Sequence, residues 1–97
     1  MIAVIFIAEV KKLPQTYFDL AKEVRALADE YGCKDFVSVS EEGKEISISY
    51  WDSQEQIVQW RQDPLHLKAQ QLGREHWYKS YTVQVVDILR EYNHTHT

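Results

Sequence analysis

The sequence predicts an α+β domain of the ferredoxin-like type, in which helices cover one face of a four-stranded antiparallel sheet. Three observations predict this fold: apolar runs with the two-residue period of strands, apolar runs with helical spacing, and their order, β-α-β-β-α-β. A chain of 97 residues is long enough for one such domain. We expect residues 1–92 to form it and residues 93–97 to be a flexible C-terminal tail.

The first strand is expected over residues 2–10, because apolar and mostly β-branched side chains occupy both of its alternating faces. Pro14 then suits the first turn of a helix, and Gly32 suits the residue after its end. Between them, apolar side chains recur every three or four residues, which predicts an amphipathic helix. These side chains are Tyr17, Leu20, Ala21, Val24, Leu27, Ala28 and Tyr31.

A β-hairpin is expected next, with strands over residues 35–41 and 45–51 around a turn at residues 42–44 that contains glycine. The second strand has an apolar face and a mixed face, because side chains alternate along a strand. Its apolar face carries Ile46, Ile48 and Tyr50, and its mixed face carries Ser47, Ser49 and Trp51.

Two helix starts follow the hairpin. Ser53 and Gln56 have the spacing of a capping box, which predicts a short helix. The pair Asp63-Pro64 combines a cap with a favoured first helical residue, and we expect this second helix to reach about residue 77. The last strand is expected over residues 79–91, with large apolar side chains on both faces.

The strand patterns also predict a homodimer. Two helical regions can cover only one face of a four-stranded sheet, yet the first and last expected strands carry large apolar side chains on both faces. The uncovered face would expose an apolar patch larger than a soluble monomer usually tolerates. The simplest remedy is a two-fold dimer in which the sheets of two protomers pack against each other.

Composition excludes several function classes. The formal net charge is −4 and the basic residues are scattered, which argues against nucleic acid or an anionic membrane surface as partner. The single cysteine, Cys33, permits no intrachain disulfide and fits a reducing cytoplasm. The apolar N-terminal run stops at Glu9 and lacks a basic start, so it resembles a buried strand rather than a signal peptide. We expect no metal and no cofactor, because neither a ligand cluster nor a glycine-rich phosphate loop is present.

The stretch from Ser47 to Tyr81 holds all three tryptophans and is the candidate functional region. Helical spacing after Pro64 creates a candidate pocket stripe of His66, Ala69, Gln70, Gly73 and Trp77. It also creates a candidate core stripe of Leu65, Ala69, Leu72 and His76. A glycine inside a helix costs about 1 kcal/mol relative to alanine. Gly73 therefore indicates close approach of a ligand or another element, or a change of helix direction.

Each candidate residue has two interpretations. His66 could transfer a proton, because imidazole titrates near neutral pH, or it could be a partly exposed histidine without a task. Trp60 could stack on a flat substrate or belong to the core. Tyr50 and Tyr81 could orient a substrate oxygen or only pack.

These motifs resemble the antibiotic biosynthesis monooxygenase family. The resemblance rests on Ser49-Tyr50-Trp51, Ser53, Glu55, Ile57, Trp60-Arg61, His66, Ala69-Gln70, Gly73-Arg74, Trp77-Tyr78 and Tyr81. It implies a dimeric α/β barrel, made of two ferredoxin-like protomers packed through their sheets. Studied members include oxygenases that oxidise aromatic polyketide intermediates without metal or flavin. The resemblance implies that Trp60 is a cavity wall and His66 the base or hydrogen-bond partner, with Tyr50, Gln70, Trp77 and Tyr81 as substrate contacts.

Other relatives degrade haem with an asparagine, a tryptophan and a ligating histidine. Trp60 matches their tryptophan, but Gln70 stands near the position of their histidine. The first strand offers Ile5, Ile7 and Ala8 where their asparagine lies. Both departures count against haem degradation.

The sequence therefore supports a leading hypothesis and two alternatives. The leading hypothesis is a cofactor-independent monooxygenase that oxidises an aromatic, polyketide or quinol-like small molecule. The first alternative is a non-catalytic dimeric module that binds a small hydrophobic ligand or a partner, and the second is a haem-binding protein. A cavity of a few hundred Å³ beside Trp60 would favour an enzyme or ligand carrier over a purely structural role.

Overall fold

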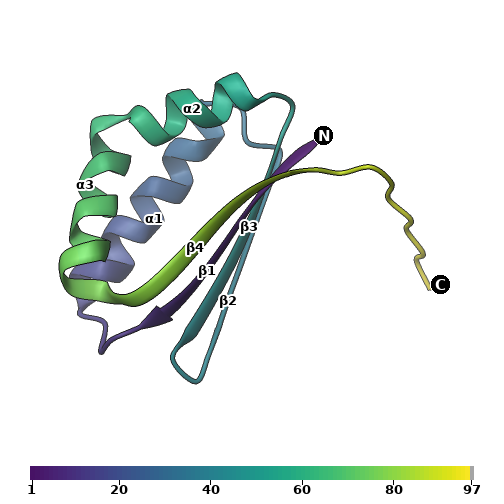
Figure 1. The fold of residues 1–97 in the computed structure, drawn as a ribbon. Coiled ribbons are helices and arrows are strands. Elements are labelled where there is room, and N and C mark those ends of the chain that lie inside the picture. The colour runs from purple at the N-terminus through teal and green to yellow at the C-terminus, as the bar shows by residue number, and fades with distance from the viewer. Residues whose placement is uncertain (97) are drawn as a thin grey trace.

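The computed structural model describes residues 1–96 and has the predicted ferredoxin-like architecture. Its elements are β1 (Ile2–Val10), α1 (Gln15–Glu30), β2 (Asp35–Glu41), β3 (Lys44–Trp51), α2 (Gln54–Gln62), α3 (Pro64–Leu72), a π-helical segment η1 (Gly73–Trp77) and β4 (Tyr78–Asp87). The strands form one antiparallel sheet in the order β2-β3-β1-β4, and the helices lie together on one face of it (Figure 1). The predicted α+β fold class is confirmed.

The central strands β1 and β3 define the two faces of the sheet. Their register places Val4 opposite Ser49 and Ile5 opposite Ile48. Val4 packs in a core cluster with residues of the helices, so Val4 and Ser49 face the helical layer. Because side chains alternate along a strand, Ile5 and Ile48 point to the other face.

Local sequence signals set the helix boundaries. Gly32, with φ of +98°, lies just beyond the end of α1, in a conformation that L side chains rarely adopt. The capping box at the start of α2 is present in both directions between Ser53 and Gln56. The Asp63 side chain accepts a hydrogen bond of 2.9 Å from the Leu65 backbone N–H at the start of α3.

Two aromatic-rich core clusters lie between the sheet and the helices. One contains Trp51 and Trp60, whose ring centroids are 5.0 Å apart. The other joins Tyr17 and Leu20 of α1 to Trp77. The tryptophans of the candidate region are therefore buried and contribute to the stability of the fold.

The last strand ends four residues earlier than expected, at Asp87 rather than at residue 91. The reason is the length of β1, its neighbour in the sheet, because Asp87 pairs with Ile2 at the start of β1. One further backbone hydrogen bond, 3.0 Å from the Ile88 N–H to the Met1 carbonyl, closes the ladder.

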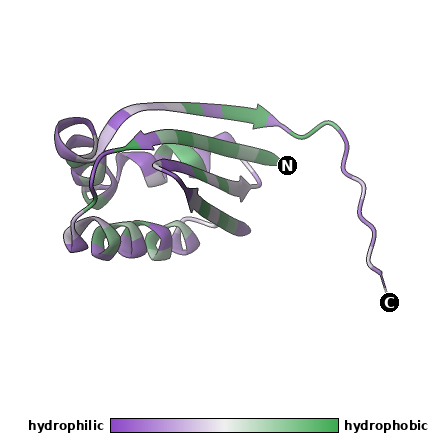
Figure 2. Cartoon of the chain, turned by 90° about the horizontal axis from the view of Figure 1, so that it is seen from below, coloured by the Kyte–Doolittle hydropathy of each residue, from purple (hydrophilic) through white to green (hydrophobic). Residues whose placement is uncertain are grey.

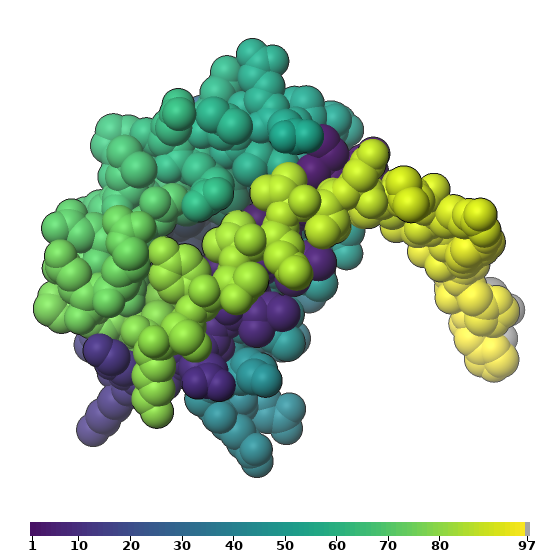
Figure 3. All heavy atoms as spheres, viewed as in Figure 1, coloured from purple at the N-terminus to yellow at the C-terminus, as the bar shows by residue number. Residues whose placement is uncertain are grey.

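The C-terminal segment projects away from the body of the molecule (Figure 3). Residues 88–96 are in neither helix nor strand. Thr97, the last residue of the expected tail, lies outside the described residues. The domain boundary at residue 92 stays a prediction.

The face of the sheet opposite the helices is apolar and uncovered. Its exposed side chains include Ile7, Val37 and Val39, with exposed fractions of 38%, 46% and 59%. Hydrophobic bands run along the strands that form this face (Figure 2). Within residues 1–96, none of the helices has the length and hydrophobicity needed to cross a membrane.

Candidate functional site

A cavity of about 330 Å³ lies between the sheet and the helices. All four strands, the three helices and η1 contribute lining residues, and most of the lining is apolar. Such a volume is at the small end of the range for ligand-binding cavities. The space beside Trp60 is therefore not filled by side chains, as a purely structural role would require.

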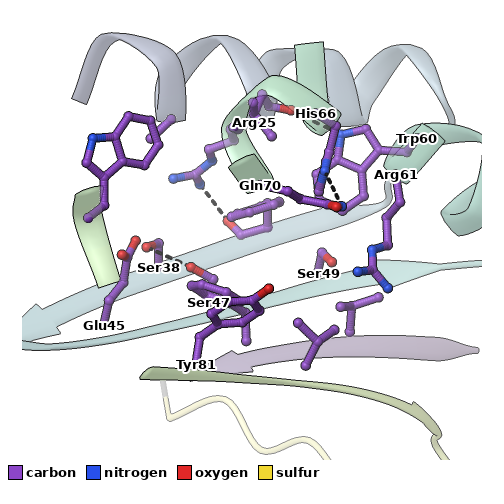
Figure 4. Close-up of a pocket in the computed structure, with 18 of the residues that line it drawn as sticks. Arg25, Ser38, Glu45, Ser47, Ser49, Trp60, Arg61, His66, Gln70 and Tyr81 are labelled. Atoms are coloured by element: carbon purple, nitrogen blue, oxygen red, sulfur yellow. Dashed lines mark hydrogen bonds between the residues drawn. The ribbon is translucent and has the colours of Figure 1, made fainter. Parts of the chain in front are cut away.

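One side of the cavity is formed by Trp60, His66 and Gln70 (Figure 4). The His66 ring stands edge-on to Trp60, with centroids 4.4 Å apart and planes at 81°. The Trp60 indole N–H donates to the Val24 carbonyl at 3.2 Å, which fixes the orientation of its ring. Gln70 lies one helical turn after His66, and its amide lies 3.0 Å from His66 Nδ1.

Burial and the positive charge of Arg61 lower the pKa of His66 from its ordinary 6.5 to about 4. The imidazole is therefore neutral at pH 7. With the Gln70 amide assigned as donor to Nδ1, the proton of the neutral ring is on Nε2. In this arrangement His66 is a hydrogen-bond donor through Nε2.

The opposite side of the cavity contains a carboxylate among phenols. The Tyr17 hydroxyl donates a hydrogen bond to Glu45 Oε2. Burial is the largest cause that raises the pKa of Glu45, and the hydrogen bond from Tyr17 opposes it. Burial also raises the pKa of Tyr17 well above its ordinary value and that of Tyr78 to about 12. Both phenols are therefore neutral at physiological pH.

Aromatic side chains form the walls near Glu45. Trp77 has an exposed fraction of 4% and meets Tyr17 edge-on, with centroids 5.0 Å apart. Tyr81 lies on β4, where its ring centroid is 5.7 Å from that of Phe6. The arrangement gives the cavity flat apolar surfaces that suit an aromatic ligand.

Gly73 allows one of these walls to form. A Cβ atom at this position would lie 2.6 Å from the Tyr78 ring. The helix that was expected to reach residue 77 ends as α3 at Leu72 and continues as the π-helical segment η1. The close approach of another element, the Tyr78 ring, therefore explains this glycine, and the helix changes from α to π hydrogen bonding at the same residue.

The structure brings five of the six candidate residues to one cavity: Trp60, His66, Gln70, Trp77 and Tyr81. Tyr50 is not among the lining residues, because it alternates with Ser49 and Trp51 and points to the uncovered face of the sheet. Tyr50 therefore lies outside this cavity.

Sequence reasoning did not identify Tyr17, Arg25 or Glu45 as cavity residues. One signal was available for Glu45, which precedes Ser47 and Ser49 by two and four residues and shares their face of β3. That polar row lies under the helices and forms the floor of the cavity.

The fold and the cavity define a ferredoxin-like domain with an internal, aromatic-lined, ligand-sized site. A sequence model described as antibiotic biosynthesis monooxygenase matches residues 1–72. The chain belongs to the antibiotic biosynthesis monooxygenase family. The matched part contains Trp60, His66 and Gln70, while Trp77 and Tyr81 follow it.

Two relatives and one solved structure illustrate the similarity. YqjZ from Bacillus subtilis is 37% identical over 91 residues, which are 92% of this chain and 80% of that protein. Jasmonate monooxygenase ABM from Pyricularia oryzae is 34% identical over 95 residues, which are 91% of this chain but only 43% of that enzyme. SnoaB, a cofactor-independent oxygenase from Streptomyces nogalater, superposes with a TM-score of 0.77 at 11% identity, over 93% of this chain and 94% of SnoaB. The similarity to SnoaB shows the fold alone.

Proposed function

We propose that the protein is a cofactor-independent monooxygenase that oxidises a small aromatic, polyketide or quinol-like molecule with dioxygen. The observation that carries the proposal is the aromatic-lined cavity, with the neutral imidazole of His66 at one side and the carboxylate of Glu45 at the other. Family membership supports the proposal, as does similarity to two proteins, a jasmonate monooxygenase and a cofactor-independent oxygenase.

The chemistry needs a substrate that can supply its own electrons. An anthrone-type substrate has a CH2 group that loses a proton to give a delocalised anion. This anion donates electrons to dioxygen. Overall, the CH2 group and O2 give a carbonyl group and water, so one oxygen atom enters the product. The protein contributes an aromatic-walled cavity, hydrogen bonds to the developing oxyanion and a proton acceptor.

Oxygen consumption tests the proposal. Wild-type protein, without added metal or cofactor, is mixed with a panel of anthrones and hydroquinones in an oxygen-electrode cell. We expect uptake with at least one compound, with the product gaining one oxygen atom by mass spectrometry. Trp60→Ala should lose most of this activity, whereas Val58→Ala, an exposed change on the same helix, should retain it. Absence of uptake with every compound would reject this function.

The active form that we propose is a homodimer joined through the uncovered faces of the two sheets. The apolar side chains of the uncovered sheet face, with Val39 among them, support this arrangement, because a second copy of the chain would bury the same patch on both protomers. We place the protein in the cytoplasm, since its one cysteine, Cys33, is a free thiol.

A further inference from the structure

The position of Glu45 is unusual for a carboxylate. It stands on β3 opposite Ala8 of β1 and Ser40 of β2, on the face of the sheet that the helices cover. Figure 4 shows its carboxylate directed from the strand into the space below the helices. Burying a charged group is costly unless it is hydrogen-bonded. Glu45 accepts a hydrogen bond from the Tyr17 hydroxyl at Oε2. Glu45 also lines the cavity.

Tyr17 holds this carboxylate in place. The phenol has an exposed fraction of 4% and comes from α1, 28 residues earlier in the chain. Its pKa is raised, so it remains a donor and Glu45 remains the acceptor. Burial raises the pKa of Glu45, and the hydrogen bond from Tyr17 opposes this rise, so Tyr17 favours the carboxylate form that can accept a proton.

The other side of the cavity has the opposite character. There the Gln70 amide, assigned as the donor to Nδ1, leaves the proton of the neutral His66 ring on Nε2, and Arg61 adds a positive charge that acts on the ring. Figure 4 places Glu45 on one side of the cavity and His66 with Arg61 on the other. A carboxylate and an imidazole therefore lie on opposite sides of one aromatic-walled cavity, above a floor of serine side chains.

We infer that Glu45 is the catalytic base, that Tyr17 positions it, and that His66 stabilises the substrate oxyanion instead of removing the proton. This inference rests on the proposed monooxygenase function and deepens it. It specifies a carbon acid whose acidic C–H and carbonyl oxygen lie on opposite sides of a ring, as in an anthrone. The C–H bond breaks, the proton forms an O–H bond on Glu45, and the electron pair moves through the ring to the carbonyl oxygen.

Hydrogen–deuterium exchange isolates this step from oxygen chemistry. Anthrone is incubated with each protein in D2O under argon, and loss of its CH2 signal is followed by ¹H NMR against a protein-free control. Wild type should accelerate the exchange. Glu45→Gln keeps an oxygen that accepts from Tyr17 but removes the base, and we expect exchange to slow by about 10²-fold or more. Glu23→Gln, an exposed change on α1 outside the cavity, is the charge-matched control and should exchange like wild type.

Tyr17→Phe separates catalysis from structure, because it breaks the hydrogen bond and keeps the base. If Glu45 is the base, Tyr17→Phe should remain within about tenfold of wild type and well above Glu45→Gln. If Glu45→Gln exchanges at nearly the wild-type rate while Tyr17→Phe loses the exchange activity, the Tyr17–Glu45 pair has only a structural role and the inference is overturned. Oxygen uptake by wild type without any exchange would also overturn it while leaving the proposed function standing. If wild type shows neither exchange nor oxygen uptake, the inference and the proposed function are both overturned.

Discussion

The His66 imidazole stands edge-on to the Trp60 indole, with ring centroids 4.4 Å apart and planes at 81°. The two residues come from different helices, α2 and α3, which meet at the Asp63-Pro64 junction. Trp60 is nearly buried and its N–H is used by the Val24 carbonyl, so the indole is a rigid support for the histidine. The pair joins the core of the fold to the proposed site.

The first prediction concerns the donor role of His66. His66→Phe keeps a ring against Trp60 and removes the N–H, so kcat for oxygen uptake should fall by about 10²-fold, as for loss of one oxyanion-hole donor. His66→Gln retains a donor and should lose less, about tenfold. Steady-state kinetics measure both changes. His76→Gln, in an exposed histidine of η1, serves as control and should behave like wild type. Equal activity in His66→Phe and wild type would exclude this role.

The second prediction concerns stability and pH. The pKa of His66 is about 4 in the folded protein and about 6.5 when unfolded, so between these values the unfolded chain binds more protons. Stability from the neutral ring is thus fully present above pH 6.5 and is lost as the pH falls towards 4. The difference corresponds to about 3 kcal/mol, and partial solvent exposure of the ring reduces it to about 2 kcal/mol.

Urea unfolding of wild type and His66→Gln at pH 7 and pH 4 measures this effect. The free energy of unfolding of wild type, relative to the variant, should decrease by about 2 kcal/mol between the two pH values. The comparison with a variant cancels the contribution of other titrating groups. Parallel pH dependences in the two proteins would contradict the lowered pKa of His66.

The sequence predicted the helical part of the site because that part depends on local spacing. His66 and Gln70 are one helical turn apart, and the caps at Ser53 and Asp63 determine where α2 and α3 begin. The aromatic residues of the same stretch fitted either a pocket or a core, and only the family resemblance implied that Trp60 is a cavity wall. Local periodicity is therefore enough to place His66 and Gln70 on one face of the same helix.

The contacts between distant segments could not be predicted in this way. Tyr17 and Glu45 are 28 residues apart and meet only after β3 pairs with β1 beneath α1. The misplacement of Tyr50 has a related cause. Both faces of β3 were evident, but alternation alone does not say which face the helices cover. Here the serine-bearing face lies under the helices and lines the cavity, while the apolar face remains open.

The third prediction concerns Gly73. In Gly73→Ala the new methyl group would lie 2.6 Å from the Tyr78 ring, so the ring must move. The strain should exceed the gain of about 1 kcal/mol in helix propensity and destabilise the protein by about 1–2 kcal/mol. Urea unfolding measures the change. Gln71→Ala, at an exposed position of α3, is the control and should be neutral within about 0.5 kcal/mol. A more stable Gly73→Ala protein would show that the close approach of Tyr78 does not matter.

The fourth prediction concerns the pH dependence of activity. The titratable groups described around Glu45 are Tyr17 from α1 and Tyr78 from β4, both neutral, while the adjacent strands present Ala8 and Ser40. The hydrogen bond from Tyr17 lowers the pKa of Glu45, so its loss in Tyr17→Phe should raise that pKa.

Because a base must be deprotonated, kcat/KM should fall on the acid side of the profile, and Tyr17→Phe should shift this fall to higher pH. The control is Tyr92→Phe in the exposed C-terminal segment, whose profile should match that of wild type. An unshifted acid limb in Tyr17→Phe would argue that Glu45 does not control it. A merely structural effect of the substitution would lower the whole profile without moving its inflection.

The last prediction concerns the uncovered sheet face. Val39 is 59% exposed there, and in the proposed homodimer Val39→Lys would place one desolvated ammonium group on each protomer. We expect wild type to be a dimer by light scattering coupled to size exclusion, and Val39→Lys to be a folded monomer at the same micromolar concentration. Val58→Lys introduces the same charge at a valine of α2 that is 50% exposed, and this variant should stay dimeric. A wild-type monomer, or a dimer that both lysine variants leave intact, would mean that this apolar face does not join the protomers.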